Sequence, residues 1–457
     1  MSEQFDAIVV GAGPAGMAAA SLLAERGAAV ALLDEQPAPG GQIYRGIEAA
    51  SPGLRALLGA EYAHGAGLAA RLRASGAAYR PGSAVWNLTP AREVWVSRGG
   101  ASSMLRARAL ILATGAMERP VPVPGWTLPG VMGAGAVQIL LKTAALRPDS
   151  LVLAGSGPLL YLLAAQCLAA GSRILGLLDT TARANEWAAL RHLPGATGWG
   201  LLGKGLLLKA QLRAAGVPTW RRVSELRLEG GGAVEAVSFL AGGQRQRIET
   251  PLVVLHEGVI PAQQATRALG CAHEWDAGQR CFRPVLDGWG NTSIDGVLVA
   301  GDGAGIGGAR AAEHAGRIAA AEVLRQLGRL DAAARDALAA PDRRARAGHL
   351  AARPFLDALY PPPPAILRPA DDVVVCRCEE VTAGALRQVA AQGCQGPNQA
   401  KSFLRAGMGP CQGRLCGPVV SEVLAEALGR GVEDVGYYRI RPPLKPVTVG
   451  ELATAEG

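Results

Sequence analysis

The chain has 457 residues and a mass of 46.9 kDa, which is enough for two or three domains. Hydrophobic residues make up 49% of it and aromatic residues only 4%, which is typical of a loop-rich α/β protein with a sizeable core and not of a β-sandwich. The net charge is +8, but the arginines are scattered and no stretch interleaves basic with aromatic residues. We therefore expect no nucleic-acid partner.

The start of the chain, MSEQFD, is acidic and leads directly into an apolar strand, so we predict no signal peptide and a cytoplasmic location. Any membrane contact is expected to be peripheral and made through a complex. Leu151–Gly171 is uncharged and just long enough to span a membrane, but it contains the turn GSGPLL, which favours a strand–turn–helix unit and no membrane span. Eight cysteines without an export signal favour metal ligation or burial over disulfides.

The sequence DAIVVGAGPAG near the N-terminus predicts a dinucleotide-binding unit. Ala7–Val10 is an apolar strand, and Gly11, Gly13 and Gly16 follow it in the register G-x-G-x-x-G. The first glycine turns the chain off the strand, the second lets backbone approach a pyrophosphate, and the third lets the helix pack closely on the sheet. The N–H groups at the start of that helix favour phosphate.

The elements that follow this turn complete the unit. A helix is predicted over Ala15–Arg26 and a parallel strand over Ala28–Leu33, which ends at Asp34. A carboxylate at that position accepts hydrogen bonds from the ribose hydroxyls of adenosine. Gly40 and Gly41 then let the backbone run close to a flavin or its phosphates.

The next segments lead out of the first unit. Residues 46–75 are predicted to be a helical insertion, and Ala84–Arg108 a small β-meander. Leu110–Gly115 is predicted to be a separate buried strand whose small residues return the chain to the cofactor. Glu118–Val131 is rich in turn residues and is expected to be a hinge.

A second nucleotide-type unit begins with a predicted strand over Leu151–Ala154, followed by Gly155 and Gly157 of GSGPLL and a helix. Leu160 replaces the third glycine, which puts dinucleotide binding in doubt. Asp179, at the end of the next strand, would suit a ribose hydroxyl and repel a 2′-phosphate, which favours NAD over NADP. The sequence leaves NAD, ATP or no ligand open here.

A third informative segment is the predicted strand Val297–Ala300, which ends at Gly301 and Asp302 and precedes an alanine-rich helix. An aspartate at this position can bind the ribityl or phosphate side of a flavin, or it can cap the helix. The match to the first unit favours the flavin. Further on, the four prolines Pro361–Pro364 predict a stiff, extended linker and a domain boundary.

Four cysteines beyond this linker form two close pairs. Cys376 and Cys378 are spaced C-x-C, and Cys411 and Cys416 are spaced C-x4-C. Four thiolates suit an iron–sulfur cluster or zinc, but structural zinc prefers wider spacing in both pairs, so a two-iron cluster is favoured. Cys394 lies between the pairs and is not expected to be a ligand.

Several motifs occur together in this chain: GAGPAG with LLDEQPAPGGQIYR, ATGAMERPVPVPGWTLPGVM, VAGDGAGIGGARAAE, CRCEEVT with AGMGPCQGRLCG, and the tail RPPLKPVTVGELA. In this combination the chain resembles the FAD-binding α-type (A) subunits of heteromeric flavin-dependent amine and imino-acid dehydrogenases. That group includes opine oxidase, hydrogen cyanide synthase and dye-linked proline or hydroxyproline dehydrogenase. The resemblance covers nearly the whole chain.

The resemblance implies an α/β fold with two glutathione-reductase-like dinucleotide-binding domains, whose parallel sheets have three-layer packing. It also implies a small C-terminal helical domain similar to bacterioferritin-associated ferredoxin, with a [2Fe-2S] cluster. The implied domains are a discontinuous FAD-binding domain (1–118 and 285–340), a second, NAD(P)-type domain (119–284), a linker (341–372), the [2Fe-2S] domain (373–430) and a C-terminal tail (431–457).

Carried over by position, the resemblance also implies the residues of each site. FAD would contact Gly11, Gly13, Ala15, Gly16, Asp34, Glu35, Gly41, Gln42, Thr114, Gly115, Gly301 and Asp302. The second nucleotide site would use Gly155 and Gly157, and the cluster would use Cys376, Cys378, Cys411 and Cys416.

In such complexes the amine is oxidised on a separate subunit related to D-amino-acid oxidase. A small ferredoxin-like subunit is a further candidate partner, and some relatives carry FMN at a subunit interface. The resemblance therefore implies an electron-transfer subunit, without a catalytic set of its own, for a secondary amine, opine or (hydroxy)proline-like substrate. Two alternatives stay open: a self-sufficient NAD(P)H-dependent FAD and iron–sulfur oxidoreductase, and a zinc- or redox-sensing interaction module with a vestigial flavin site.

Overall fold

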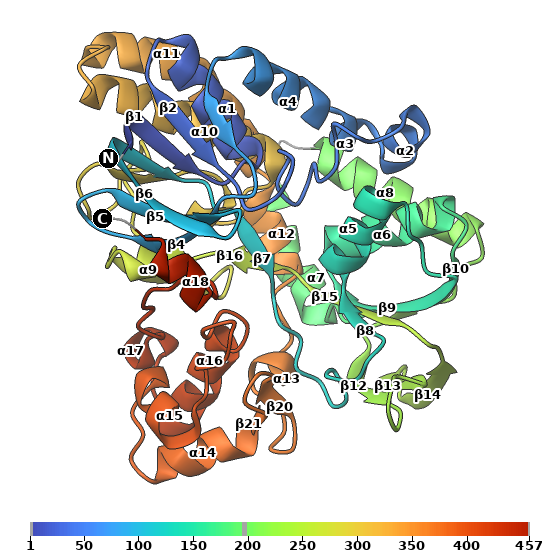
Figure 1. Ribbon diagram of the computed structural model, residues 1–457. Coiled ribbons are helices and arrows are strands. Elements are labelled where there is room, and N and C mark those ends of the chain that lie inside the picture. The colour runs from blue at the N-terminus through green and yellow to red at the C-terminus, as the bar shows by residue number, and fades with distance from the viewer. Residues whose placement is uncertain (1–2, 194–198, 456–457) are drawn as a thin grey trace.

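The computed structural model of the chain describes residues 3–193 and 199–455 (Figure 1). The first two residues of the acidic start, residues 194–198 of the predicted second domain and residues 456–457 of the predicted tail lie outside the described residues. The described chain forms two α/β units and a helical C-terminal region that contains the paired cysteines. The predicted α/β fold class is confirmed.

The first unit is built on a seven-stranded sheet with the order β3-β2-β1-β6-β5-β4, in which β19 also pairs with β6. Parallel pairing joins β3, β2, β1, β6 and β19, whereas β4 and β5 form an antiparallel meander on the same sheet. The strands are β1 (Glu3–Val10), β2 (Val30–Leu33), β3 (Ala78–Arg80), β4 (Ala84–Leu88), β5 (Glu93–Arg98), β6 (Ala101–Leu112) and β19 (Val297–Val299).

Strand β6 corrects the expectation of a meander followed by a separate strand. It is one continuous strand of 12 residues. Its first half pairs antiparallel with β5, and its second half pairs parallel with β19, while β1 lies along its other side. Ile111 is thereby held opposite both Val9 and Leu298, in the middle of a sheet whose central positions are fully buried.

Helices α1 (Pro14–Glu25) and α10 (Ala309–Gln326) pack against each other on one face of this sheet (Figure 1). Their contact is close because both are rich in alanine, and a Cβ atom on Gly316 of α10 would lie 2.1 Å from the carbonyl oxygen of Ala15. The remaining helices of the unit are α2 (Pro52–Leu58), α3 (Ala60–Ala63), α4 (Gly65–Ala74) and α11 (Ala332–Leu350). Within the segment 46–75, which was predicted to be helical, helices extend from Pro52 to Ala74, whereas residues 46–49 form a turn.

The second unit contains a five-stranded parallel sheet with the order β11-β10-β9-β15-β8. Its strands are β8 (Val131–Gly133), β9 (Ser150–Ser156), β10 (Arg173–Asp179), β11 (Thr219–Arg221) and β15 (Val253–Glu257), and its helices are α5 (Ala134–Ala144), α6 (Pro158–Ala169), α7 (Arg183–Leu190) and α8 (Trp199–Ala214). An antiparallel sheet is added by β12 (Ser224–Glu229), β13 (Ala236–Ala241) and β14 (Gln244–Glu249).

Short elements connect the two units. Strands β7 (Ala116–Glu118) and β16 (Val259–Pro261) pair antiparallel where the chain passes between them. Helix α9 (Gln264–Ala268) and the hairpin of β17 (His273–Asp276) and β18 (Cys281–Pro284) follow before the chain returns to β19. The 3₁₀ turn η2 (Asp302–Ala304) then leads to α10.

Around Pro361–Pro364 the predicted stiff, extended linker is mostly replaced by helices, and only residues 360–363 lie between them. Helix α11 continues to Leu350, and α12 (Arg353–Leu359) and α13 (Pro364–Leu367) follow it. Helix α12 packs against α7, and Ile366 and Leu367 of α13 are buried in the core of the second unit. The prolines stand at the start of α13, a position where proline is tolerated because the first turn of a helix needs no N–H donor.

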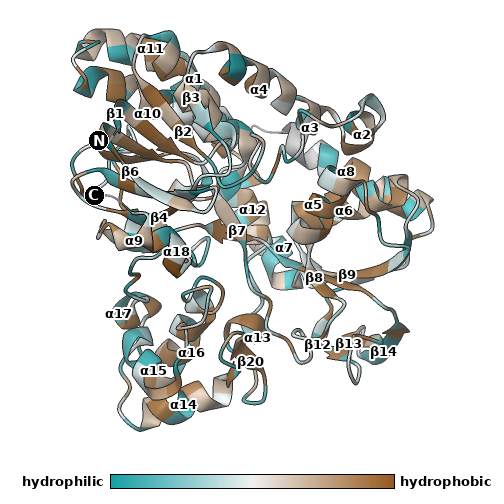
Figure 2. Cartoon of the chain, viewed as in Figure 1, coloured by the Kyte–Doolittle hydropathy of each residue, from teal (hydrophilic) through white to brown (hydrophobic). Residues whose placement is uncertain are grey.

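The C-terminal region holds β20 (Val374–Cys376), β21 (Val381–Thr382), α14 (Ala383–Ala391), α15 (Pro397–Leu404), α16 (Gly417–Leu428), α17 (Val432–Val435) and α18 (Val449–Ala453). It belongs to the same hydrophobic core as the inner strands of the first unit, and Phe282 of the connecting strand β18 packs against Tyr437 there, at a ring separation of 6.0 Å. Apolar residues line the inner strands and helix faces throughout (Figure 2). No helix in the described part of the chain is long and apolar enough to cross a bilayer.

Candidate functional site

The glycine turn after β1 has the close packing that its sequence predicts. A Cβ atom on Gly16 would lie 1.7 Å from the carbonyl oxygen of Gly11, so only glycine lets α1 come this close to the turn. Gly13 differs, because the nearest atom to a Cβ there would be the Cα of Gly41, at 3.8 Å. The start of α1 is therefore open beside Gly13, which leaves its N–H groups accessible to an anionic ligand.

Other predicted cofactor residues converge on this turn. A Cβ atom on Gly41 would lie 2.8 Å from the Cα of Gly13, and one on Gly301 would lie 2.9 Å from the Cβ of Ala15. The loop after β2 and the end of β19 thus both meet the start of α1. The structure brings these segments together at the carboxyl ends of the parallel strands, where nucleotides bind in sheets of this type.

Asp34 stands at the end of β2, and its carboxylate accepts two backbone hydrogen bonds. Its Oδ2 accepts from the N–H of Ala12 at 2.6 Å, and its Oδ1 accepts from the N–H of Gln36 at 2.8 Å. These bonds fix the carboxylate beside the glycine turn. The neighbouring Glu35 forms an ion pair with Lys445, from the C-terminal tail.

Gln42 lies against a buried lysine that the sequence reasoning missed. The Nζ of Lys142, on α5 of the second unit, donates to the carbonyl oxygens of Gln42 and Ile43 at 3.1 and 2.9 Å and to the Oε1 of Gln138 at 2.8 Å. Burial lowers the pKa of Lys142 to about 7. Nothing in the local spacing of α5 marks this lysine, because its partners are carbonyl groups of a distant loop.

Thr114 and Gly115 follow β6 and contact the segment after β16. The hydroxyl of Thr114 donates to the carbonyl of Ala262 at 3.2 Å, and the carbonyl of Gly115 accepts from the N–H of Ala262 at 2.9 Å. Asp302 is not itself the cap of α10, since Gly308 occupies that position. Its Oδ1 accepts from the N–H groups of Gly307 and Gly308, each at 2.9 Å, so it fixes the loop that leads into α10.

The acid of the second nucleotide-type unit has internal partners. The Oδ2 of Asp179 accepts from the hydroxyl of Tyr161 at 2.5 Å, and its Oδ1 accepts from the N–H of Thr181 at 2.9 Å. Asp179 is only 3% exposed. The sequence suggested a free ribose ligand at this position, and the structure instead shows a buried carboxylate that is paired within the protein. Burial and the Asp179 carboxylate raise the pKa of Tyr161.

The turn with Gly155 and Gly157 is packed against β15. A Cβ atom on Gly155 would lie 1.8 Å from the carbonyl oxygen of His256, and Leu160, in place of the third glycine, is fully buried. Glu257, which follows His256 at the end of β15, accepts hydrogen bonds from the hydroxyls of Ser156 and Thr180, both at 2.7 Å. Burial raises the pKa of Glu257 to about 7.

His256 is buried in β15 and paired with a carboxylate. Its Nδ1 lies 2.7 Å from the Oε1 of Glu118, the last residue of β7, where the chain leaves the first unit. The same glutamate accepts from the N–H groups of Ala134 and Gly135 at the start of α5. Glu118 therefore joins three elements of the hinge region between the two units.

The four predicted ligand cysteines meet as two contacting pairs, Cys376 with Cys416 and Cys378 with Cys411. Cys376 and Cys416 are buried, whereas Cys378 is exposed. The hydrogen bond from Cys416 lowers the pKa of the Cys376 thiol to about 6, and the N–H of Gly407 also donates to its Sγ, at 3.4 Å. Within residues 3–193 and 199–455, no group of three or more potential ligands already has metal-binding geometry.

Cys394 lies apart from these pairs. Its thiol donates to the carbonyl of Gly396 at 3.4 Å, and the residue is fully buried. A Cβ atom on Gly409 would lie 2.2 Å from the Cβ of Cys378, so the loop before Cys411 can approach Cys378 only with glycine at this position. The close approach of the two loops explains the glycine-rich sequence AGMGPCQG.

Comparison with known proteins agrees with this geometry. The pyridine nucleotide-disulphide oxidoreductase family model matches residues 5–319, and the sarcosine oxidase A3 domain model matches residues 372–456. Among solved structures, L-proline dehydrogenase from P. horikoshii has a similar fold, with a TM-score of 0.73 and 19% identity, over 99% of this chain and 80% of that one.

Two curated relatives are similar over almost their full length. The A subunit of opine oxidase from Rhizobium meliloti (strain 1021) is 49% identical over 98% of both chains. The HcnB subunit of hydrogen cyanide synthase from Pseudomonas aeruginosa is 34% identical over 96% of both chains. The chain therefore belongs to the pyridine nucleotide-disulphide oxidoreductase family and, within it, to the A-type subunits of heteromeric flavin-dependent dehydrogenases and oxidases.

Proposed function

We propose that this chain is the electron-transfer subunit of its complex, with FAD at the glycine turn of the first unit and a [2Fe-2S] cluster at the paired cysteines. The substrate, a secondary amine, opine or (hydroxy)proline-like amino acid, would be oxidised on a partner subunit related to D-amino-acid oxidase. Further components that the family resemblance suggests are FMN at a subunit interface and a small ferredoxin-like subunit.

The residues of the first unit fit FAD. The open space beside Gly13 suits a pyrophosphate, and Asp34 stands where the adenosine ribose would lie. Gly41 and Gly301 bring two further loops to the same place. The chain's own contribution is to bind and orient the cofactor through backbone N–H groups, with Asp302 holding the loop before α10.

The paired cysteines fit an iron–sulfur cluster. Two loops supply two contacting pairs of thiols, and a backbone N–H already donates to the sulfur of Cys376, as is common around such clusters. A flavin takes up two electrons and can release them singly, and a [2Fe-2S] cluster carries one.

The observation that carries this proposal is the firm attachment of the cysteine region, the elements from β20 to α17, to the first unit. Arg280, after β17, donates through Nε to the buried Oε1 of Glu422 on α16, at 3.1 Å. Arg267 lies over the rings of both Phe282 and Tyr437, at 4.8 and 4.4 Å. The cysteines are thus attached to the unit proposed to bind FAD, which supports a relay whose two sites belong to one chain.

A self-sufficient NAD(P)H-dependent enzyme fits this structure less well. The acid that would hold the ribose, Asp179, is buried and accepts from Tyr161 and Thr181, whereas Asp34, which also accepts two hydrogen bonds, is only partly buried. A second carboxyl group, Glu257, bonds to Ser156 of the glycine turn, where a phosphate would have to approach. We therefore expect the flavin of the anaerobic protein to show no rapid reduction when NADH is added.

The experiment that tests the proposal replaces single cysteines in the full chain, purified without oxygen. Cys378→Ser should lose iron and the broad visible absorption while it retains FAD, because the two sites lie in different regions. Cys394→Ser, at a buried cysteine outside the pairs, is the matched control and should keep both cofactors.

Activity separates the relay from an independent enzyme. The wild-type chain alone should not oxidise proline, hydroxyproline, opines or glycine with a dye as acceptor. Brisk turnover by the isolated chain would contradict the relay. A colourless protein with stoichiometric zinc would instead favour the interaction module.

A further inference from the structure

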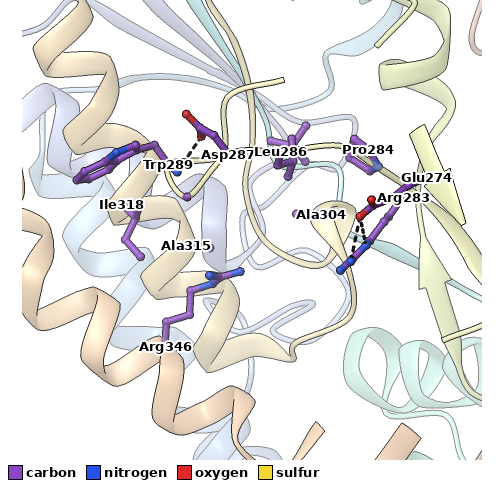
Figure 3. A pocket seen from close by; sticks show the side chains of 13 residues that line it. Glu274, Arg283, Pro284, Leu286, Asp287, Trp289, Ala304, Ala315, Ile318 and Arg346 are labelled. Atoms are coloured by element: carbon purple, nitrogen blue, oxygen red, sulfur yellow. Dashed lines mark hydrogen bonds and ion pairs between the residues drawn. The ribbon is translucent and has the colours of Figure 1, made fainter. Parts of the chain in front are cut away.

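A cavity of about 210 Å³ lies on the first unit, between α10, α11 and the loop that follows β18 (Figure 3). Its walls include Trp289 of the loop, Ile318 of α10 and Arg346 of α11. Its floor includes Ala304, the last residue of the turn η2, which begins with Asp302. The cavity is therefore one turn away from the proposed flavin site, and it contains none of the residues assigned to FAD.

The two arginines of this cavity differ in their partners. Arg283 is neutralised, because its Nε donates to Glu274 at 3.0 Å and its Nη1 lies 3.4 Å from Asp276. Arg346 has no hydrogen-bond or ion-pair partner among residues 3–193 and 199–455, although it is partly buried. In Figure 3 its guanidinium extends into the cavity, on the side opposite Arg283.

The acidic group nearest in the loop is already engaged. The carboxylate of Asp287 accepts from the N–H groups of Trp289 and Asn291 and from the side chain of Asn291, at 2.8–2.9 Å. These bonds hold Asp287 within its own loop. Asp287 therefore does not supply the missing counter-charge for Arg346.

The wall beside Arg346 is built rigidly. The ring of Trp289 is stacked between the guanidinium groups of Arg335 and Arg343, at 3.8 and 3.7 Å from its centroid. Such contacts hold an aromatic ring in one place. Arg335 is neutralised by Glu322 and Asp336, at 2.7 and 2.8 Å, so of the two arginines only Arg343 adds positive charge beside the ring. Burial and the charge of Arg343 lower the pKa of Arg346, as expected for a cation that lacks an anion.

We propose that this cavity binds a small organic oxyanion, a carboxylate or a phosphate monoester, with Arg346 as its ion-pair partner. A guanidinium that is partly removed from water needs an anion to offset its desolvation, and its planar fork matches the two oxygens of a carboxylate or phosphate. The cavity has room for the oxyanion and a small substituent. This site is independent of the FAD and cluster assignments, so either can fail without the other.

The test titrates the full-length chain as purified with inorganic phosphate and, separately, with acetate, by calorimetry at constant ionic strength in chloride. We expect saturable binding of at least one anion, and the tighter one identifies the phosphate or the carboxylate source. Arg346→Gln should weaken that binding by about tenfold or more, because a charge-assisted hydrogen bond is lost. Arg344→Gln removes the same charge from an exposed position on the same helix, outside the cavity, and should leave binding unchanged.

Thermal unfolding shows whether the variants are folded. If Arg346→Gln does not fold, Arg346→Lys keeps the charge but loses the fork, and it should still weaken binding measurably. The proposal is overturned if neither anion binds more tightly than chloride, if Arg346→Lys binds like the wild type, or if Arg346→Gln and Arg344→Gln bind alike.

Discussion

At the scale of single residues, neighbouring glycines of the first turn have different physical roles. Gly16 is required by the protein itself, since any side chain there would overlap the carbonyl of Gly11. The fold itself does not require Gly13, because the nearest atom to a Cβ there would be 3.8 Å away and its φ of −76° suits any residue, so under our proposal only the cofactor requires it. This difference separates the requirements of folding from those of cofactor binding.

Substitution of the two glycines should therefore give different results. Gly16→Ala should destabilise the whole protein, because α1 must move away from the turn. Gly13→Ala should leave the free energy of unfolding of the apoprotein within about 1 kcal/mol of the wild type and lower its FAD content. Denaturant unfolding and the flavin absorbance of each variant measure the two effects. A Gly13→Ala protein with full FAD content would contradict the placement of the pyrophosphate.

Glu257 should make stability depend on pH. Its pKa is raised from 4.5 to about 7 in the folded state, so the folded protein holds a proton that the unfolded chain has lost. The contribution of Glu257 to the free energy of unfolding is therefore fully present below about pH 4.5. It decreases as the pH rises towards 7, by about 3 kcal/mol in total. The free energy of unfolding of Glu257→Gln should lack this decrease. Relative to the wild type, the variant should therefore be more stable at pH 8 than at pH 5.

Chemical denaturation at the two pH values checks this prediction. The control is Glu235→Gln, which removes an exposed carboxylate from the same unit and should follow the wild type. A wild-type minus Glu257→Gln difference that is constant with pH would show that Glu257 does not titrate as stated.

At the scale of elements, the C-terminal tail fastens the cysteine region to the first unit. The N–H of Leu444 donates to the carbonyl of Trp86 on β4 at 2.6 Å, and Lys445 forms its ion pair with Glu35. Helix α18 then packs on β6, and its Glu451 accepts a hydrogen bond from the hydroxyl of Ser97 on the neighbouring strand β5. The tail thus reaches the strand end that carries Asp34 and Glu35.

Loss of the Lys445 ion pair should loosen this tail. In Lys445→Met the tail loses about 0.5–1 kcal/mol of attachment, the usual contribution of a partly exposed pair. Amide hydrogen exchange over Val449–Ala453 should then become several-fold faster, and Glu35→Gln should have the same effect. The double variant should be no worse than either single variant, because both remove one interaction. Lys204→Met, at an exposed lysine on α8, is the control, and unchanged exchange in Lys445→Met would refute the attachment.

At the scale of the whole molecule, local patterns predicted the elements but not what joins them. The glycine turn, the strands beside it and the paired cysteines could be found because close packing and ligation need particular residues at fixed spacing. The helical path through α12 and α13 could not, since burial against α7 and the second core overrides the stiffness that prolines confer.

The long-range pairs were also beyond local spacing. Tyr161 with Asp179 and Lys142 with Gln42 join residues whose neighbourhood depends on the finished fold. A lysine on a helix and a tyrosine in an apolar run have no local mark that distinguishes them from ordinary core or surface residues. The occupied acid of the second unit therefore emerged only from the structure.

The cysteine region is fastened at both of its ends. At its start, the indole N–H of Trp126 donates to the carbonyl of Val374 at 2.7 Å, and at its end the tail is secured at Glu35. A region attached at two points cannot rotate away from the first unit, unlike the mobile tethered domains that carry electrons between distant centres in other oxidoreductases. Electron transfer between the two proposed sites would then take place over a fixed distance. Its rate would depend on the redox potentials and on the protein between the sites, not on how quickly a domain diffuses.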